Sequence, residues 1–211
     1  MQDTLVVVSK YSEDVEWVKK IKYPCLIYDK SSTPVESSIH RPNIGREAET
    51  LLYYIITNYN SLPNKTIFLQ GDPRSNPVTY TYDEVINEVN KEHDNSLKTI
   101  LTWEGHTDIN QYWLKTCGIL NSLLFEGDSM VKYSSGVQYV IPKDVILNRP
   151  IDLYITLHML VVKFGHKGLI ANLDNLNGGI DAWTMELVWG SIFNINKKLK
   201  ENYATQLYSL L

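Results

Sequence analysis

Short apolar runs alternate with helical patterns over the first 70 residues, and this alternation limits the possible folds more than any other feature of the sequence. Residues 5–8, 26–28 and 66–69 predict short buried strands. Between them, residues 12–20 carry valines at helical spacing after a possible N-cap at Ser12, and residues 48–59 place apolar side chains on one helical face. This order is typical of an α/β protein with a central, mostly parallel sheet flanked by helices.

The remainder of the chain continues the alternation less regularly. Residues 83–90 look helical, residues 97–103 predict another strand, and residues 137–141 alternate like a half-buried strand. Helices are expected from residue 143, over 151–164 and over 183–193, with a polar tail after them. Because there is no internal repeat or flexible linker, we expect a single domain over residues 1–211.

Composition excludes several classes of protein. The net charge of −4 argues against a broad nucleic-acid-binding face, although a local anion pocket is compatible with it. Cys25 and Cys117 form neither a disulfide framework nor a zinc motif, which favours a reducing compartment. The amino terminus has no secretory pattern, and the apolar stretch at 157–164 is too short to span a bilayer. We therefore expect a soluble, cytoplasmic protein.

In a parallel α/β sheet, ligands bind outside the carboxyl ends of the strands. The segments that follow the three predicted strands are Ser9-Lys10-Tyr11, Asp29-Lys30 and Gln70-Gly71-Asp72. Asp72 is either a turn former, as Asp-Pro commonly is, or the carboxylate ligand of a hard cation such as Mn²⁺ or Mg²⁺. Tyr11 either packs at the rim of the sheet or stacks on a nucleotide base. Asp29 either caps a turn or accepts a hydrogen bond from the N–H group of that base.

Two further stretches carry candidate chemistry. In RPNIGREAET, Asn43 can cap the following helix and Arg46 would lie near its N-terminus, where a phosphate is favoured. The alternative there is a surface ion pair of Arg46 with a nearby glutamate. Glu186 either is a surface residue or binds a sugar hydroxyl beside Trp189, and the Ser135-Gly136 turn could line the same pocket. Of the histidines, only His166 is a weak candidate for a metal or phosphate contact.

Several motifs occur together in an order that resembles a known family. They are a Tyr-x-Glu-Asp-x-x-Trp start, an Asn-x-Gly-Arg-Glu helix entry, a Phe-Leu-Gln-Gly-Asp strand end and a late Glu-x-x-Trp helix. Together they resemble a glycosyltransferase-like family catalogued as of unknown function, which extends to a chlorella-virus domain thought to build capsid glycans. The resemblance covers most of the chain and implies a GT-A-type nucleotide-sugar fold. Its donor half would span about residues 1–105 and its acceptor half about 106–211.

The resemblance also implies roles for individual residues. Asp72 would hold Mn²⁺ or Mg²⁺, although Gln70 stands where the Asp-x-Asp motif of nucleotide-sugar-dependent folds has its first acid. Ser9, Lys10, Tyr11, Asp29, Asn43, Arg46, Gln70 and Gly71 would bind the donor nucleotide-sugar. Arg46 would also stabilise the departing diphosphate, and Glu186 would orient or deprotonate the acceptor. Ser135, Gly136 and Trp189 would bind the acceptor.

The expected function is therefore a metal-dependent glycosyltransferase that uses a UDP-sugar donor and a glycan or glycoprotein acceptor. The resemblance places this activity in viral capsid glycosylation, in the host cytoplasm, with no nucleic-acid partner and no membrane span. Two alternatives remain open. One is a carbohydrate-binding or assembly module without catalysis, suggested by Gln70. The other is a nucleotidyltransferase, which would also use strand-end acids and a metal.

Overall fold

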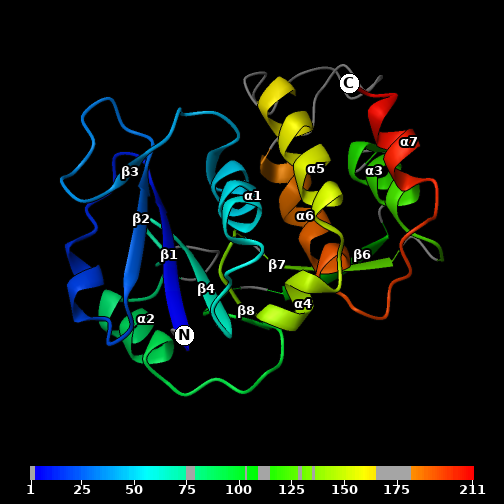
Figure 1. The fold of residues 1–211 in the computed structure, drawn as a ribbon. Helices are drawn as coiled ribbons and strands as arrows, with labels where there is room; N and C mark the ends of the chain where they lie inside the picture. Colours follow the sequence, from blue (N-terminus) through cyan, green and yellow to red (C-terminus); the bar gives the residue numbers. More distant parts are fainter. Residues whose placement is uncertain are drawn as a thin grey trace.

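The central sheet has six strands in the order β3–β2–β1–β4–β8–β5 (Figure 1). The computed structural model describes residues 3–74, 79–102, 104–108, 115–127, 130–134, 136–164 and 182–211. The sheet strands are β1 (Thr4–Lys10), β2 (Cys25–Asp29), β3 (Ile39–His40), β4 (Lys65–Gln70), β5 (Lys98–Thr99) and β8 (Tyr139–Pro142). The first four run parallel, and β8 is antiparallel to both β4 and β5. The α/β class and the mostly parallel sheet predicted from the sequence are thus confirmed.

Helices cover both faces of the sheet, and the two layers differ in thickness. The thick layer is built mainly from α1 (Arg46–Asn58), α5 (Ile151–Phe164) and α6 (Ala182–Ile192), and the thin layer from the 3₁₀ helix η1 (Glu16–Lys20) and α2 (Tyr82–Val89). Successive residues of a strand point to opposite faces. Val7 therefore packs in the thick layer, and Val6 and Val8 pack against the thin one. Because both faces are covered, the central residues of β1 (5–8) and β4 (67–69) form continuous apolar runs rather than alternating with polar residues.

The remaining elements lie beside the thick layer. The strands β6 (Glu104–Asp108) and β7 (Met130–Ser134) form a separate antiparallel pair, with β7 against α6. The helices α3 (Lys115–Leu124) and α7 (Tyr203–Tyr208) pack together on the same side, and α4 (Lys143–Leu147) follows β8. Since β8 from the second half of the chain lies between β4 and β5, the two halves share one sheet.

Some sequence-based boundaries were wrong. The helix expected over residues 12–20 is the five-residue η1, which begins after Val15, so Ser12 does not cap it. Glu13 and Asp14 instead accept hydrogen bonds from nearby backbone N–H groups and hold the preceding residues in a turn. The strand expected over 97–103 is only β5, and the expected polar tail contains α7. The strands β3, β6 and β7 were not predicted; β3 has only two residues and β6 is polar, so neither carries an apolar alternation.

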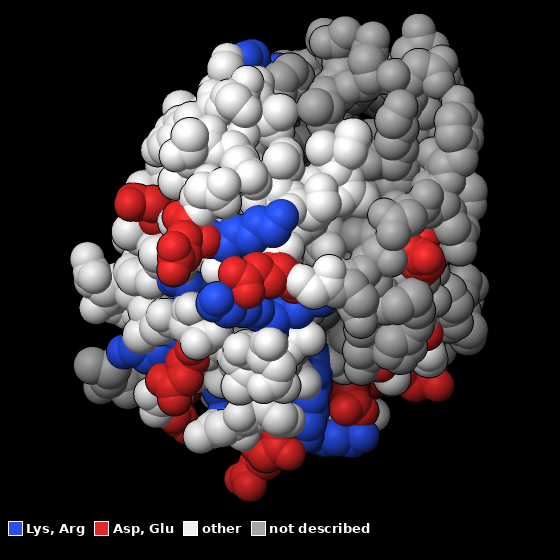
Figure 2. Space-filling model, turned by 90° about the vertical axis from the view of Figure 1, so that its right-hand side faces the viewer, with Lys and Arg blue, Asp and Glu red and all other residues white. Residues whose placement is uncertain are grey.

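Charged side chains are interspersed on the face that Figure 2 shows. Lys and Arg lie next to Asp and Glu over its described part, and no large patch of one sign is visible there. Among the described residues, no helix combines the length and the apolar character that a bilayer crossing needs. Cys25 and Cys117 are both free thiols, as expected from the absence of a disulfide motif.

Candidate functional site

A cleft of about 360 Å³ opens at the carboxyl ends of β1 and β4. Its lining residues are Ser9, Lys10, Tyr11, Glu13, Lys30, Asn43, Arg46, Glu47, Gln70, Gly71 and Asp72. These include every residue that was predicted to bind the donor, with the exception of Asp29. The pairing of Ser9 with Gln70 across β1 and β4 aligns the two strand ends. The sheet thus brings together three segments that are far apart in the sequence.

The position of the cleft follows from the strand order. The chain passes from β1 to β2 and β3 on one side, and then crosses to β4 on the other side of β1. In doubly wound sheets this reversal leaves a crevice at the carboxyl ends of the two strands, because the connections lead away in opposite directions. The cleft lies at this topological switch point.

Asp72 lies on the cleft wall and is also a turn residue. Its Oδ1 accepts hydrogen bonds from the Arg74 backbone N–H at 3.2 Å and from Arg74 Nε at 2.8 Å, and its Oδ2 accepts from Arg74 Nη2 at 2.8 Å. This guanidinium holds the pKa of Asp72 below its usual value. The guanidinium carbon of Arg74 also lies 4.2 Å from the centroid of the Tyr82 ring. Asp72 is therefore an ionised, oriented carboxylate.

Asp29 is buried beneath the cleft rather than on its wall. Its oxygens accept hydrogen bonds from the backbone N–H groups of Ser31 and Val35, and Lys10 Nζ lies 3.3 Å from Oδ2. Although burial opposes ionisation, these hydrogen bonds lower the pKa of Asp29. In this position Asp29 shapes the loop after β2 and fixes Lys10. It does not offer an edge to a base.

A buried charge cluster holds the wall formed by residues 41–46. Glu49, which is fully buried, pairs with Lys30, Arg41 and His158. Lys30 Nζ also donates to the carbonyl oxygens of Pro42, at 3.2 Å, and Ile44, at 3.1 Å. All three ammonium donors of Lys30 are thus used inside the protein, and its role at the cleft is structural.

The entry to α1 differs from the expected cap. Gly45 is the N-cap, with a φ of 61°, and no side chain caps the helix; Asn43 lies on the cleft wall instead. A Cβ on Gly45 would lie 2.2 Å from Val161 Cγ1, so this glycine permits the close packing of α1 on α5 rather than a close approach to a ligand. Arg46 also has a positive φ, of 49°.

Arg46 is the cationic side chain of the described lining that keeps donors available. Its side chain is 66% exposed, and its Nε lies 3.5 Å from Glu47 Oε2 in a weak ion pair. By contrast, Lys10 Nζ donates to the Tyr11 carbonyl at 3.0 Å and pairs with Asp29, and its side chain is buried. A guanidinium has five N–H donors, so Arg46 can clamp an anion without breaking a buried contact.

The cleft contains carboxylates that the sequence interpretation missed. Glu13 Oε2 accepts the Tyr11 backbone N–H at 2.6 Å and would meet a Cβ on Gly71 at 2.7 Å. Glu47 lies beside Arg46. Both residues belong to the motifs that carry the family resemblance, and this was the available signal. Tyr11 itself is 49% exposed, which leaves its ring open at the rim.

The predicted acceptor residues are not all brought together. Burial and the nearby charge of Glu47 raise the pKa of Glu186. A backbone hydrogen bond from Gly136 and the charge of Arg46 lower it, but the net shift is upward. Glu186 therefore lies within electrostatic reach of the cleft without lining it. Trp189 has no exposed surface and stacks on Phe193 with centroids 5.4 Å apart, so it belongs to the core in this structure. Ser135 and His166 lie outside the described residues.

The oxygen donors fit a single-carboxylate cation site better than a protein-made cage. No group of three His, Cys, Asp or Glu side chains in the described part of the chain is placed to hold a metal. A carboxylate has about four acceptor sites, and Arg74 uses two on Oδ1 and one on Oδ2 of Asp72. One site on Oδ2 is left for a cation. Mg²⁺ and similar ions are commonly held by one or two carboxylates plus substrate phosphates.

The comparisons with known proteins give a family and no further relatives. A family model described as "Protein of unknown function (DUF3431)" matches residues 5–118. The matched region includes every lining residue of the cleft. Neither a curated protein nor a solved structure matches the chain.

Proposed function

The chain belongs to the DUF3431 family, whose function is unknown, and we propose that it is a glycosyltransferase that moves a sugar from a UDP-sugar to a glycan or glycoprotein acceptor. As part of the same proposal, we assign its fold to the GT-A type. We also propose that its activity requires Mn²⁺ or Mg²⁺. The observation that carries the proposal is the cleft at the β1–β4 switch point. This is the position at which doubly wound sheets bind nucleotides, and here it combines an exposed arginine, an oriented carboxylate and an open aromatic ring.

The electrostatics of the cleft favour a diphosphate that binds together with a cation. The lining carries the carboxylates of Glu13, Glu47 and Asp72, of which Asp72 pairs with Arg74 and Glu47 weakly with Arg46, while the charges of Lys10 and Lys30 are paired internally. An anion entering alone would therefore meet no excess of positive charge from the described lining. A divalent ion at Asp72 would reverse this balance and neutralise the charge that develops on the leaving diphosphate. Arg46 would contribute on the same side through two parallel hydrogen bonds.

The other residues of the cleft suit a nucleotide donor. The exposed Tyr11 ring offers a stacking surface for the uracil. Asn43 and Gln70 supply amide donors and acceptors for the ribose and sugar hydroxyls. Because Glu49 and Lys30 fix the wall that carries Asn43, the backbone at Asn43 is positioned before the ligand binds.

In the proposed transfer, an acceptor hydroxyl oxygen attacks the anomeric carbon of the donor sugar. The new C–O bond forms as the bond from that carbon to the diphosphate oxygen breaks, and UDP leaves with the electron pair. Glu186 would orient the acceptor hydroxyl or take its proton. A carboxyl whose pKa is raised by burial is a better proton acceptor near neutral pH than an exposed one. If configuration is retained, Glu186 only positions the acceptor, and the hydroxyl proton passes to the leaving diphosphate oxygen.

Binding of UDP with Mn²⁺ is the first test. A ligand at about 100 times its dissociation constant stabilises the folded state by about 2.7 kcal/mol. For a chain of this length, this corresponds to a rise in melting temperature of about 5–11 °C. We expect this rise with UDP and Mn²⁺ together, and a much smaller one with either alone. No shift under any of these conditions would refute the proposal.

Two variants separate the roles of Asp72 and its arginine partner. Asp72→Asn is expected to abolish the Mn²⁺-dependent part of UDP binding, because the remaining acceptor site on Oδ2 loses its charge. Arg74→Gln removes the same ion pair but keeps the carboxylate, so it should preserve or strengthen Mn²⁺-dependent binding. Equal losses in both variants would mean that the ion pair matters only for the turn.

Turnover separates the proposal from its rivals. Release of UDP from a panel of UDP-sugars, with and without glycan acceptors, is expected for a transferase. A non-catalytic module would bind UDP-sugars without releasing UDP. A nucleotidyltransferase would bind UTP in preference to UDP-sugars in a competition titration.

A further inference from the structure

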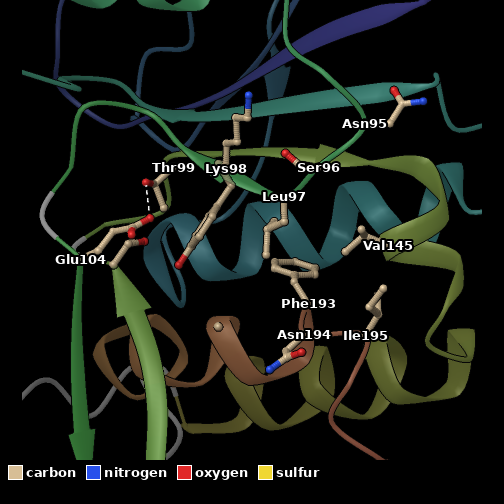
Figure 3. Close-up of a pocket in the computed structure, with 13 residues that line it drawn as sticks. Asn95, Ser96, Leu97, Lys98, Thr99, Glu104, Val145, Phe193, Asn194 and Ile195 are labelled. Carbon is tan, nitrogen blue, oxygen red and sulfur yellow. Dashed lines mark hydrogen bonds between the residues drawn. The ribbon is translucent and has the colours of Figure 1, made fainter.

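A second cavity of about 380 Å³ lies under the β5 edge of the sheet and shares no residue with the cleft. In Figure 3, the Leu97 side chain points toward the Phe193 ring, with Val145 and Ile195 on one side and Glu104 and Thr99 on the other. The side chains that face the cavity come from β5, α4 and the end of α6 and from the segments beside them. Its walls are mostly apolar, in contrast to the charged walls of the cleft.

Two neighbouring buried hydroxyl groups line this cavity and make no well-formed hydrogen bond. Tyr139, on β8, is 2% exposed, and Ser134, at the end of β7, is 1% exposed. Neither Tyr139 OH nor Ser134 Oγ makes a hydrogen bond of ordinary geometry to a described group, although the two residues lie close enough for Ser134 to act on the pKa of Tyr139. Both hydroxyls therefore keep hydrogen-bonding capacity that a ligand could use. Burial also raises the pKa of Tyr139, so its hydroxyl stays protonated and can both donate and accept.

We propose that this cavity binds a small uncharged molecule with an apolar body and one hydroxyl or carbonyl oxygen, which hydrogen-bonds to Tyr139 and Ser134. Ligand sites typically combine an apolar cavity of about 300–1,000 Å³ with a few convergent polar groups. The apolar body would lie against the apolar side chains of the lining, Leu97, Val145 and Phe193.

The charges around the cavity exclude an ionic ligand. Lys98 Nζ pairs with Asp94 at 3.1 Å, and its side chain points away from Phe193 in Figure 3. Glu104 accepts the Thr99 hydroxyl at 2.6 Å and would repel an anion. A cation would lose its hydration against the apolar walls, and the lining carboxylate of Glu104 is exposed and already accepts the Thr99 hydroxyl. The cavity shares no lining residue with the cleft, although the charge of Glu186 acts on Tyr139.

The test uses 2-naphthol and naphthalene as probes, titrated by calorimetry or by their fluorescence. Both should bind the wild-type protein, with 2-naphthol the tighter of the two. Tyr139→Phe should weaken 2-naphthol binding about fivefold to tenfold, which is the contribution of one neutral hydrogen bond, and leave naphthalene unaffected. The melting temperature of unliganded Tyr139→Phe should change little, because the hydroxyl it removes makes no hydrogen bond of ordinary geometry.

A blocking variant and its control locate the site. Val145→Phe fills the cavity from α4 and should reduce binding of both probes more than tenfold. Leu147→Phe adds the same ring to an exposed position on α4 and should not affect binding. The proposal is overturned if neither probe binds, or if Val145→Phe and Leu147→Phe behave alike. It is also overturned if Tyr139→Phe weakens both probes equally.

Discussion

Replacing Glu49 with Gln removes a buried carboxylate from contact with Lys30, Arg41 and His158. Arg41 keeps some access to solvent, whereas Lys30 is nearly fully buried and would be left with neutral oxygen acceptors only. An ammonium group without a counter-charge at this depth is the principal cost of the substitution.

Two independent routes give a similar size for this cost. Breaking a buried ion pair by removing one partner typically destabilises a protein by about 3–5 kcal/mol. Although burial opposes it, hydrogen bonding from His158 and the charge of Lys30 lower the pKa of Glu49 from 4.5 to about 2. That shift corresponds to about 3 kcal/mol of stability above pH 4.5. The expected fall in melting temperature is about 6–20 °C.

The pKa shift of Glu49 predicts how the stability difference between wild type and Glu49→Gln changes with pH. Because the folded-state pKa of Glu49 is depressed, its contribution is present above pH 4.5 and is lost as the pH falls towards 2. Urea unfolding should therefore show a large gap between wild type and Glu49→Gln at pH 7 and a small gap near pH 2. Glu16→Gln, in the exposed pair with Lys19, is the control and should leave stability nearly unchanged.

A double variant completes the test. Lys30→Met together with Glu49→Gln removes both buried charges and should recover most of the lost stability, because no unpaired ammonium remains. A loss below about 1 kcal/mol in Glu49→Gln, or no recovery in the double variant, would refute this description of the cleft wall.

Three further substitutions test other parts of the structure. Gly45→Ala should destabilise the protein by about 2–5 kcal/mol in thermal unfolding, because Ala disfavours the positive φ and its Cβ would collide with Val161. Thr81→Ala removes the capping box of α2, in which the hydroxyl accepts the Glu84 N–H, and should cost about 1 kcal/mol by urea unfolding. Glu186→Gln should keep the UDP- and Mn²⁺-dependent thermal shift but lose transfer to an acceptor; unchanged transfer would contradict its assigned role.

The strand-end positions of Tyr11, Gln70 and Asp72 could be predicted because their placement depends on local patterns. A buried parallel strand must be apolar on both faces, and the residue at which this apolar run stops marks the edge of the sheet. The sequence therefore located most of the cleft before any tertiary contact was known. The long helices α1 and α5 were predictable for a similar reason, because their apolar faces repeat over several turns.

Only the tertiary structure decided which charges are available to a ligand. In the sequence, Lys30, Arg46 and Asp29 are equally plausible contacts, but folding buries Lys30 against Glu49 and Asp29 against the loop after β2. Arg46 alone of these three stays exposed. The sequence by itself determined the α/β class, the strand ends and the residues that meet there. Charge pairing between distant segments depends on burial and separation in space, and these are properties of the packed molecule rather than of any local pattern.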